Sequence, residues 1–229
     1  MTTQHSLARI GAIAAVLGAV LFLAATFLHP LGADPNDPTA AFAEYAADSF
    51  WVWSHLGQFL GVAVLGVAFV ALAATLEPGL AAAWGRIGQA GAAVTVAAAA
   101  ALQAVDGVAL KVAVDRWATA AADQRNLAFE AAYAVRQVEI GLASLFSLVS
   151  GLTVLVLGLA LIGSSRYPAW LGALGILAGL GLLGSGSAQA QAGFSGTAMT
   201  LSMGASVVLL VWVLLAGVFM WRLARQAGA

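Results

Sequence analysis

The sequence predicts an all-α protein, a polytopic bundle of six membrane-spanning helices that forms a single domain over residues 1–229. Hydrophobic residues make up 62% of the chain and charged residues only 8%, whereas soluble globular proteins carry about 25% charged residues. A helix needs about 20 apolar residues to cross the hydrocarbon core of a bilayer. The stretches that meet this length cover about residues 7–28, 51–76, 87–114, 131–162, 169–189 and 198–221.

The first span has the position of a signal peptide but not its form. Arg9 stands near its start, yet its apolar core is longer than the 7–15 residues that are usual for such peptides. The sequence ATFLHP that ends it is a poor cleavage site. We therefore expect a helix that is retained in the protein.

The connection between the first two spans predicts a short helix of its own. Asp37 can cap a helix whose first residue is Pro38. Phe42 and Tyr45 then share one face, which is typical of an amphipathic helix lying on the membrane surface. The second span follows with Trp51, which belongs to the aromatic belt at the same interface.

The remaining spans follow from long apolar runs separated by brief polar segments. Short turns, EPGLAAAWGR and GSSRYP, precede the third and the fifth spans. The run DQRNLAFEAAYAVRQVE is the exposed start of the fourth helix. In the fifth, Gly175 and Gly179 have the small-xxx-small spacing that allows helices to approach closely. The sixth is apolar from Ala198 to Trp221.

The positions of the basic residues predict that both termini are cytoplasmic, because Lys and Arg concentrate in cytoplasmic connections. The 29–50 connection, which would then lie outside, has four acidic residues and no Lys or Arg. The chain has eight Arg and one Lys with abundant Ala and Gly, which is typical of a GC-rich bacterial genome. We expect a multi-pass protein of the bacterial inner membrane. The arginines that fall inside are Arg9, Arg86, Arg166, Arg222 and Arg225, and the basic residues that break the pattern are Lys111, Arg116 and Arg125.

Polar side chains from several spans are expected at one depth in the outer leaflet. Their depths follow from the rise of about 1.5 Å per residue along helices of assigned direction. Ionisable groups within a membrane are a functional hypothesis by default, because they are costly in lipid. The candidates for ligand binding or proton transfer are His55, Gln58, Gln103, Asp106, Tyr133, Arg136 and Glu139.

Helical phase gives an expected pairing within this layer. Lys111 points away from Asp106 and is better placed to pair with Asp115, four residues on. Asp106 then needs a partner from another helix, and we expect Arg136, with His55 or Glu139 as a further member. Two interpretations stay open: a site that binds a ligand or proton, and an ion pair that only fixes helix register.

Three classes of function remain. The first is a transporter-like or sensor-like protein whose outward-facing intramembrane pocket binds a small ligand, an ion or a lipid headgroup. The second is a structural or accessory subunit whose partner is another membrane protein. The third is a haem- or metal-binding redox protein, for which the metal candidates are His29, His55, Asp106 and Glu139.

Composition excludes several other classes. Without cysteine the chain can form no thiolate metal site, no iron–sulfur cluster and no c-type haem attachment, which leaves b-type haem or a histidine-ligated metal open. A net charge of −1 with no basic run gives no support to nucleic-acid binding. No nucleophile–base pair stands out, so an enzymatic reaction is not predicted.

Overall fold

The structure, a computed structural model, describes residues 3–30 and 32–226, and all regular structure in these residues is helical. Six helices are long and apolar enough to cross a membrane, with α4, η1 and α5 forming one continuous helix, Leu80–Thr119. The prediction of an all-helical protein with six spans is confirmed. The elements are α1 (Thr3–Phe27), α2 (Pro38–Ala47), α3 (Trp51–Ala74), α4 (Leu80–Gln103), the π-helix η1 (Ala104–Leu110), α5 (Lys111–Thr119), α6 (Arg125–Ile162), α7 (Ala169–Ala192) and α8 (Gly196–Arg225).

The six spans form a closed ring. Each span packs mainly on its neighbours in the sequence, in the order α1, α3, α4, α6, α7 and α8, and α8 returns to contact α1. Contacts across the ring, such as those between α3 and α6, are few in the described residues. Because of this order, the centre of the bundle is bordered by all six spans.

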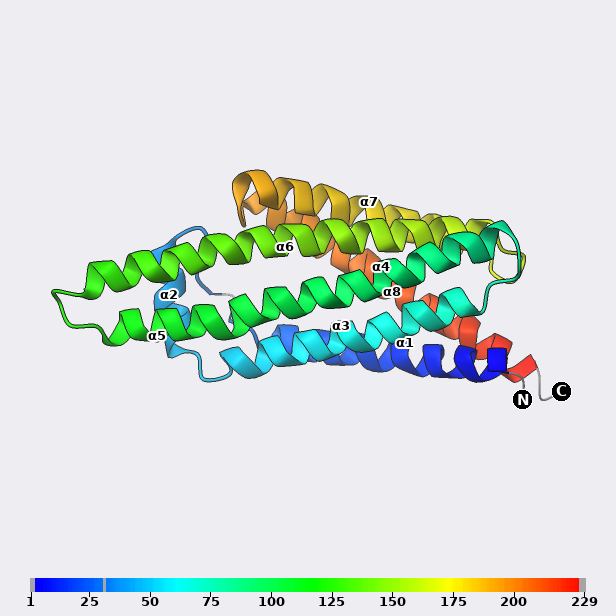
Figure 1. Ribbon diagram of the computed structural model, residues 1–229, viewed down its shortest axis with the longest axis horizontal. Coiled ribbons are helices and arrows are strands. Elements are labelled where there is room, and N and C mark those ends of the chain that lie inside the picture. Colours follow the sequence, from blue (N-terminus) through cyan, green and yellow to red (C-terminus); the bar gives the residue numbers. More distant parts are fainter. Residues whose placement is uncertain (1–2, 31, 227–229) are drawn as a thin grey trace.

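The two ends of the bundle differ. The start of α1 and the end of α8 lie at one end, called here the terminus end, and α2 crosses the opposite end, called the α2 end (Figure 1). At the start of α2, the carboxylate of Asp37 accepts hydrogen bonds from the backbone N–H groups of Thr39 and Ala40, and Pro38 is the first helical residue. Pro38 suits this position because it has no N–H to satisfy.

The helix formed by α4, η1 and α5 and the helix α6 are longer than a membrane requires. Forty residues, Leu80–Thr119, rise about 60 Å at 1.5 Å per residue, whereas a hydrocarbon core is about 30 Å thick. These helices therefore extend past the predicted spans at residues 87–114 and 131–162. Figure 1 shows α5 and the start of α6 extending past α2. Aromatic rings of Phe42, Trp117 and Phe129 pack where these three elements meet.

Glycines let α6 and α7 approach each other to near backbone contact. A Cβ added at Gly158 would lie 2.7 Å from the carbonyl oxygen of Gly172, and one added at Gly151 would lie 2.8 Å from that of Gly179. No larger residue fits at either position unless the helices move apart. This packing holds the ring together in the absence of a hydrophobic driving force between helices in lipid.

Candidate functional site

The residues predicted as the polar layer come from the start of α3, from the α4–η1 junction and from the first part of α6, all toward the α2 end (Figure 1). All of them except Tyr133 form two separate charged pairs and one amide pair. The pairs are His55 with Asp106, Arg136 with Glu139, and Gln58 with Gln103.

His55 lies between two hydrogen-bond acceptors. Its Nδ1 is 2.6 Å from the backbone oxygen of Trp51, and its Nε2 is 3.2 Å from Oδ2 of Asp106. The imidazole is 1% exposed. Because Nδ1 donates to a carbonyl, Nε2 presents a proton to the carboxylate only when the imidazole is charged. Nε2 lies within ion-pair distance of Oδ2 but makes no hydrogen bond among the described residues. With the imidazole charged, the pair has no net charge.

A π-helix brings Asp106 to this position. Asp106 lies in η1, where the indole N–H of Trp51 donates to its backbone oxygen at 3.0 Å. A Cβ added at the next residue, Gly107, would lie only 2.5 Å from Cβ of His55, so the glycine lets α3 and η1 touch. Single-turn π segments within α-helices are frequent at functional sites. A regular α-helix was expected here, and the π-helix was not predicted.

Two buried oxygens beside this pair have no hydrogen-bond partner among the described residues. They are Oδ1 of Asp106 and Oε1 of Gln103. The amide group of Gln103 is used on its other side, where Nε2 donates to Oε1 of Gln58 at 3.3 Å. The Asp106 side chain is 15% exposed and that of His55 is 1% exposed. Buried polar atoms without a partner are uncommon in proteins, and a water molecule, an ion or a ligand can satisfy them.

Arg136 pairs with Glu139 on its own helix. Nη1 of Arg136 is 2.6 Å from Oε2 of Glu139, and both residues are buried. Nη2 donates to the backbone oxygen of Pro35 at 3.2 Å, and the guanidinium lies over the rings of Tyr45 and Phe194 at 5.5 and 4.7 Å. Arg136 thus joins the α1–α2 and α7–α8 connections to α6.

The expected pairing of Asp106 with Arg136 was therefore wrong. The i, i+3 spacing on α6 gives Arg136 a carboxylate within reach on its own helix. Asp106 instead meets His55, which the sequence analysis had included only as a further member. The expected pair of Lys111 with Asp115 is confirmed, with Nζ and Oδ1 2.6 Å apart.

Aromatic rings surround His55. The ring of Trp51 lies 4.4 Å from that of His55, and the ring of His29 lies 5.0 Å from it. Burial lowers the pKa of His29, and the nearby His55 adds to this effect, so His29 favours its neutral form. The two imidazoles lie nearly in contact, whereas two axial histidines stand on opposite faces of a haem. The metal candidates His29, His55, Asp106 and Glu139 do not form a joint site, because no group of three or more such ligands occurs in the described residues.

A recess of about 510 Å³, part of it open to solvent, lies at the α2 end beside Arg136. Tyr133 and Gln137 of α6 border it, together with Pro35 and Asn36 of the α1–α2 connection. Tyr133 is 39% exposed and stacks on Phe129, so it belongs to this recess and not to the buried pairs. Gln137 and Asn36 were not among the predicted site residues, because no periodic pattern joins a connection to a helix face.

Comparisons with protein-family models, with curated proteins and with solved structures found no match to this chain. The interpretation of the site therefore rests on the residues and their geometry.

Proposed function

We propose that this protein binds one small monovalent cation in the polar layer at the α2 end, in exchange for the proton held by His55 and Asp106. The layer faces the outside of a bacterial inner membrane, both termini are cytoplasmic, and α2 is an amphipathic helix on the outer surface. The distribution of basic residues in the sequence supports this orientation.

The observation that carries the proposal is the charge balance of the buried groups. Arg136 and Glu139 neutralise each other at 2.6 Å. His55 and Asp106 are neutral together only while they hold one proton. When that proton leaves, one negative charge remains in a region of low dielectric constant, where an unpaired charge is costly. A monovalent cation restores the balance, and a divalent ion exceeds it.

The unpartnered oxygens give the cation its place. Oδ1 of Asp106 and Oε1 of Gln103 are both acceptors without donors, and oxygen ligands are what alkali-type cations and ammonium prefer. Trp51 and Tyr45 lie with their rings 4.2 Å apart beside His55, and aromatic faces attract cations. Binding of a cation and protonation of the pair should therefore exclude each other.

Thermal unfolding of the protein in lipid nanodiscs tests this exchange. The midpoint is measured in NaCl, KCl or NH4Cl against N-methylglucamine chloride at equal ionic strength, at pH 6 and pH 8.5. One of the small cations should raise the midpoint more at pH 8.5, because fewer protons compete. When the concentration of the bound cation is ten times its Kd, binding stabilises the folded state by about 1.4 kcal/mol.

Two isosteric variants separate binding from general salt effects. Asp106→Asn removes the charge but keeps the shape, and it should abolish the cation effect. Asp115→Asn is the matched control, because Asp115 is 49% exposed and pairs with Lys111 on the next helical segment; it should respond as the wild type does. Equal responses of all three proteins, or no response to any cation at either pH, would contradict the proposal.

The recess beside Arg136 supports a second candidate, the binding of an anion or of an anionic lipid headgroup. Arg136, Tyr133 and Gln137 offer donors toward it. This candidate is the weaker one, because Glu139 already neutralises the positive charge of Arg136 that would attract an anion. Inorganic phosphate should then stabilise the wild type more than a variant with Tyr133→Phe and Gln137→Leu, and equal stabilisation would dismiss it.

A further inference from the structure

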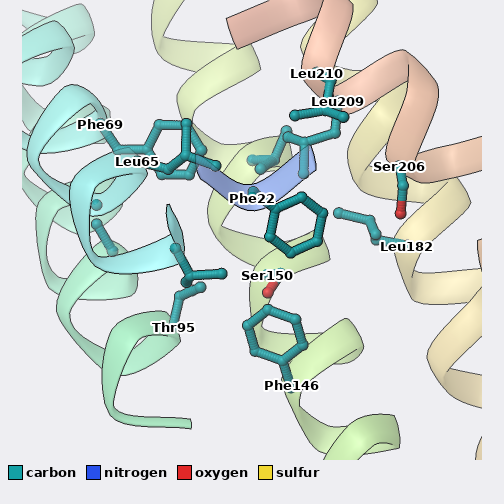
Figure 2. A pocket seen from close by; sticks show the side chains of 14 residues that line it. Phe22, Leu65, Phe69, Thr95, Phe146, Ser150, Leu182, Ser206, Leu209 and Leu210 are labelled. Carbon is teal, nitrogen blue, oxygen red and sulfur yellow. The ribbon is translucent and has the colours of Figure 1, made fainter. Parts of the chain in front are cut away.

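The centre of the helix ring contains a cavity that none of the charged pairs lines. Its volume is about 70 Å³, and residues of all six spans line it. This volume holds a small organic group but not a whole long-chain molecule, since a single water needs about 10–15 Å³. Figure 2 shows phenylalanine and leucine side chains meeting around it, among them Phe22, Phe69, Phe146 and Leu182. Such a lining disfavours water, because a water molecule needs two to four polar partners.

One buried polar atom in this apolar lining has no partner. Ser150 of α6 is 6% exposed, and its hydroxyl has no hydrogen-bond partner among the described residues. Figure 2 shows this hydroxyl between the rings of Phe22 and Phe146. The other buried hydroxyl of the lining, that of Thr95, is 3.1 Å from Oγ1 of Thr153 and is satisfied. A bound molecule would therefore form its hydrogen bond with the hydroxyl of Ser150.

The cavity lies where α1 and α8 separate. Near the terminus end these two helices are tightly packed, since a Cβ at Gly11 would lie 2.6 Å from Sδ of Met220 and one at Gly217 would lie 3.0 Å from Cβ of Ala15. Figure 1 shows α8 running obliquely, so that toward the α2 end it lies beside α7 and away from α1. The cavity residues of α8, Ser206, Leu209 and Leu210, and Phe22 of α1 come from this separated part.

From this geometry we infer that the cavity binds the oxygen-bearing end of a free apolar molecule, such as a long-chain alcohol or ketone, which enters from the membrane between α1 and α8. Its oxygen lies at the hydroxyl of Ser150, the adjoining carbon atoms fill the space among the phenylalanines, and the rest of the chain extends between α1 and α8 into the membrane. A phospholipid tail fits less well, because its polar end stays at the membrane surface and leaves the Ser150 hydroxyl unsatisfied. This site is independent of the proposed cation site.

Photolabelling in nanodiscs tests the inference with two probes, a diazirine-bearing hexadecanol and a diazirine-bearing hexadecane. Adducts are located by mass spectrometry of peptides. The alcohol should label peptides that contain Phe146 and Leu182, and excess unlabelled hexadecanol should compete. Ser150→Ala should weaken the labelling by the alcohol about tenfold, which is the effect of one hydrogen bond. Ser187→Ala is the matched control, since this exposed serine bonds only to its own helix, and it should change nothing.

A second variant fills the cavity. Ala92 lines the cavity and is 1% exposed, so Ala92→Leu should abolish labelling by the alcohol at the cavity peptides. Equal labelling by the two probes, unchanged in Ser150→Ala, would show that ordinary lipid tails occupy the space and would overturn the inference. Labelling restricted to lipid-facing peptides in the wild type would overturn it as well, and this result does not depend on the folding of Ala92→Leu.

Discussion

At the terminus end the acidic side chain of Glu77 lies in a connection, whereas at the α2 end Glu139 and Asp106 lie inside the helix ring. Glu77 accepts hydrogen bonds from the hydroxyl of Ser164 and from the backbone N–H of Ser165. Glu139 depends on one arginine, and Asp106 keeps one oxygen without a partner. The connection can supply several donors to one carboxylate, but regular helices have already used their backbone N–H groups.

This difference supports the choice of the α2 end for the proposed site. Near the terminus end the helices are held by close packing and by satisfied polar groups, such as the indole N–H of Trp212, which donates to the backbone oxygen of Leu171 at 3.0 Å. At the α2 end a π-helix, buried charges and unpartnered oxygens all lie together. A protein departs from local rules mainly where a functional site requires it.

The largest expected effect comes from leaving a charge unpaired at the α2 end. Arg136→Ala should lower the free energy of unfolding by about 3–5 kcal/mol, because Glu139 is then buried without its partner. The double variant Arg136→Met, Glu139→Leu should recover most of this loss. Titration with SDS in mixed micelles measures both values. If the single variant is as stable as the wild type, the pair contributes little, and the contrast between the two ends is lost.

The next effect concerns packing near the terminus end. Gly158→Leu should lower the free energy of unfolding by about 1–3 kcal/mol, because its side chain meets the backbone of α7. Gly184→Leu is the control, since a Cβ at Gly184 has no neighbour within 4 Å among the described residues. The same titration compares the two variants. Equal stabilities would mean that the contact of α6 with α7 does not depend on glycine.

The spans could be predicted because a long apolar run is a local property of the sequence. The continuation of the α4–α5 helix past residue 114 could not, because it depends on packing against α2. The exposed start of α6 was predicted from the run DQRNLAFEAAYAVRQVE. The pair of Lys111 with Asp115 was also local, and it was predicted correctly.

The partner of Asp106 was a different kind of problem. Its identity depends on how α3 is placed against η1, and on a π-turn that rotates the residues after Gln103 relative to a regular α-helix. The spacing of apolar residues in the sequence does not predict that turn. The only local signal is Gly107, which allows His55 to approach, and a glycine in a chain with 26 of them is not distinctive. The central cavity was missed for a similar reason, because it exists only through the closure of all six helices.

The smallest expected effect is that of the satisfied carboxylate at the terminus end. Burial alone would raise the pKa of Glu77, but the hydrogen bonds from Ser164 and Ser165 outweigh it and lower the pKa to about 2. Because the folded pKa lies below the ordinary value of 4.5, the carboxylate stabilises the fold above pH 4.5, and this contribution is lost as the pH falls toward 2. Glu77→Gln should lower the free energy of unfolding by about 1 kcal/mol at pH 7, since Glu77 is only partly buried and solvent weakens the interaction.

Unfolding midpoints of Glu77→Gln and of the wild type at pH 7, 4 and 3 check this prediction. The difference between the two proteins should shrink from pH 7 to pH 3, since protonation removes from the wild type what the substitution removes from the variant. Ser164→Ala, which takes away one of the two donors, should fall between them at pH 7. A difference that stays constant with pH would mean that the Glu77 carboxylate is no better satisfied than a free one, and that the terminus end does not owe its stability to paired polar groups.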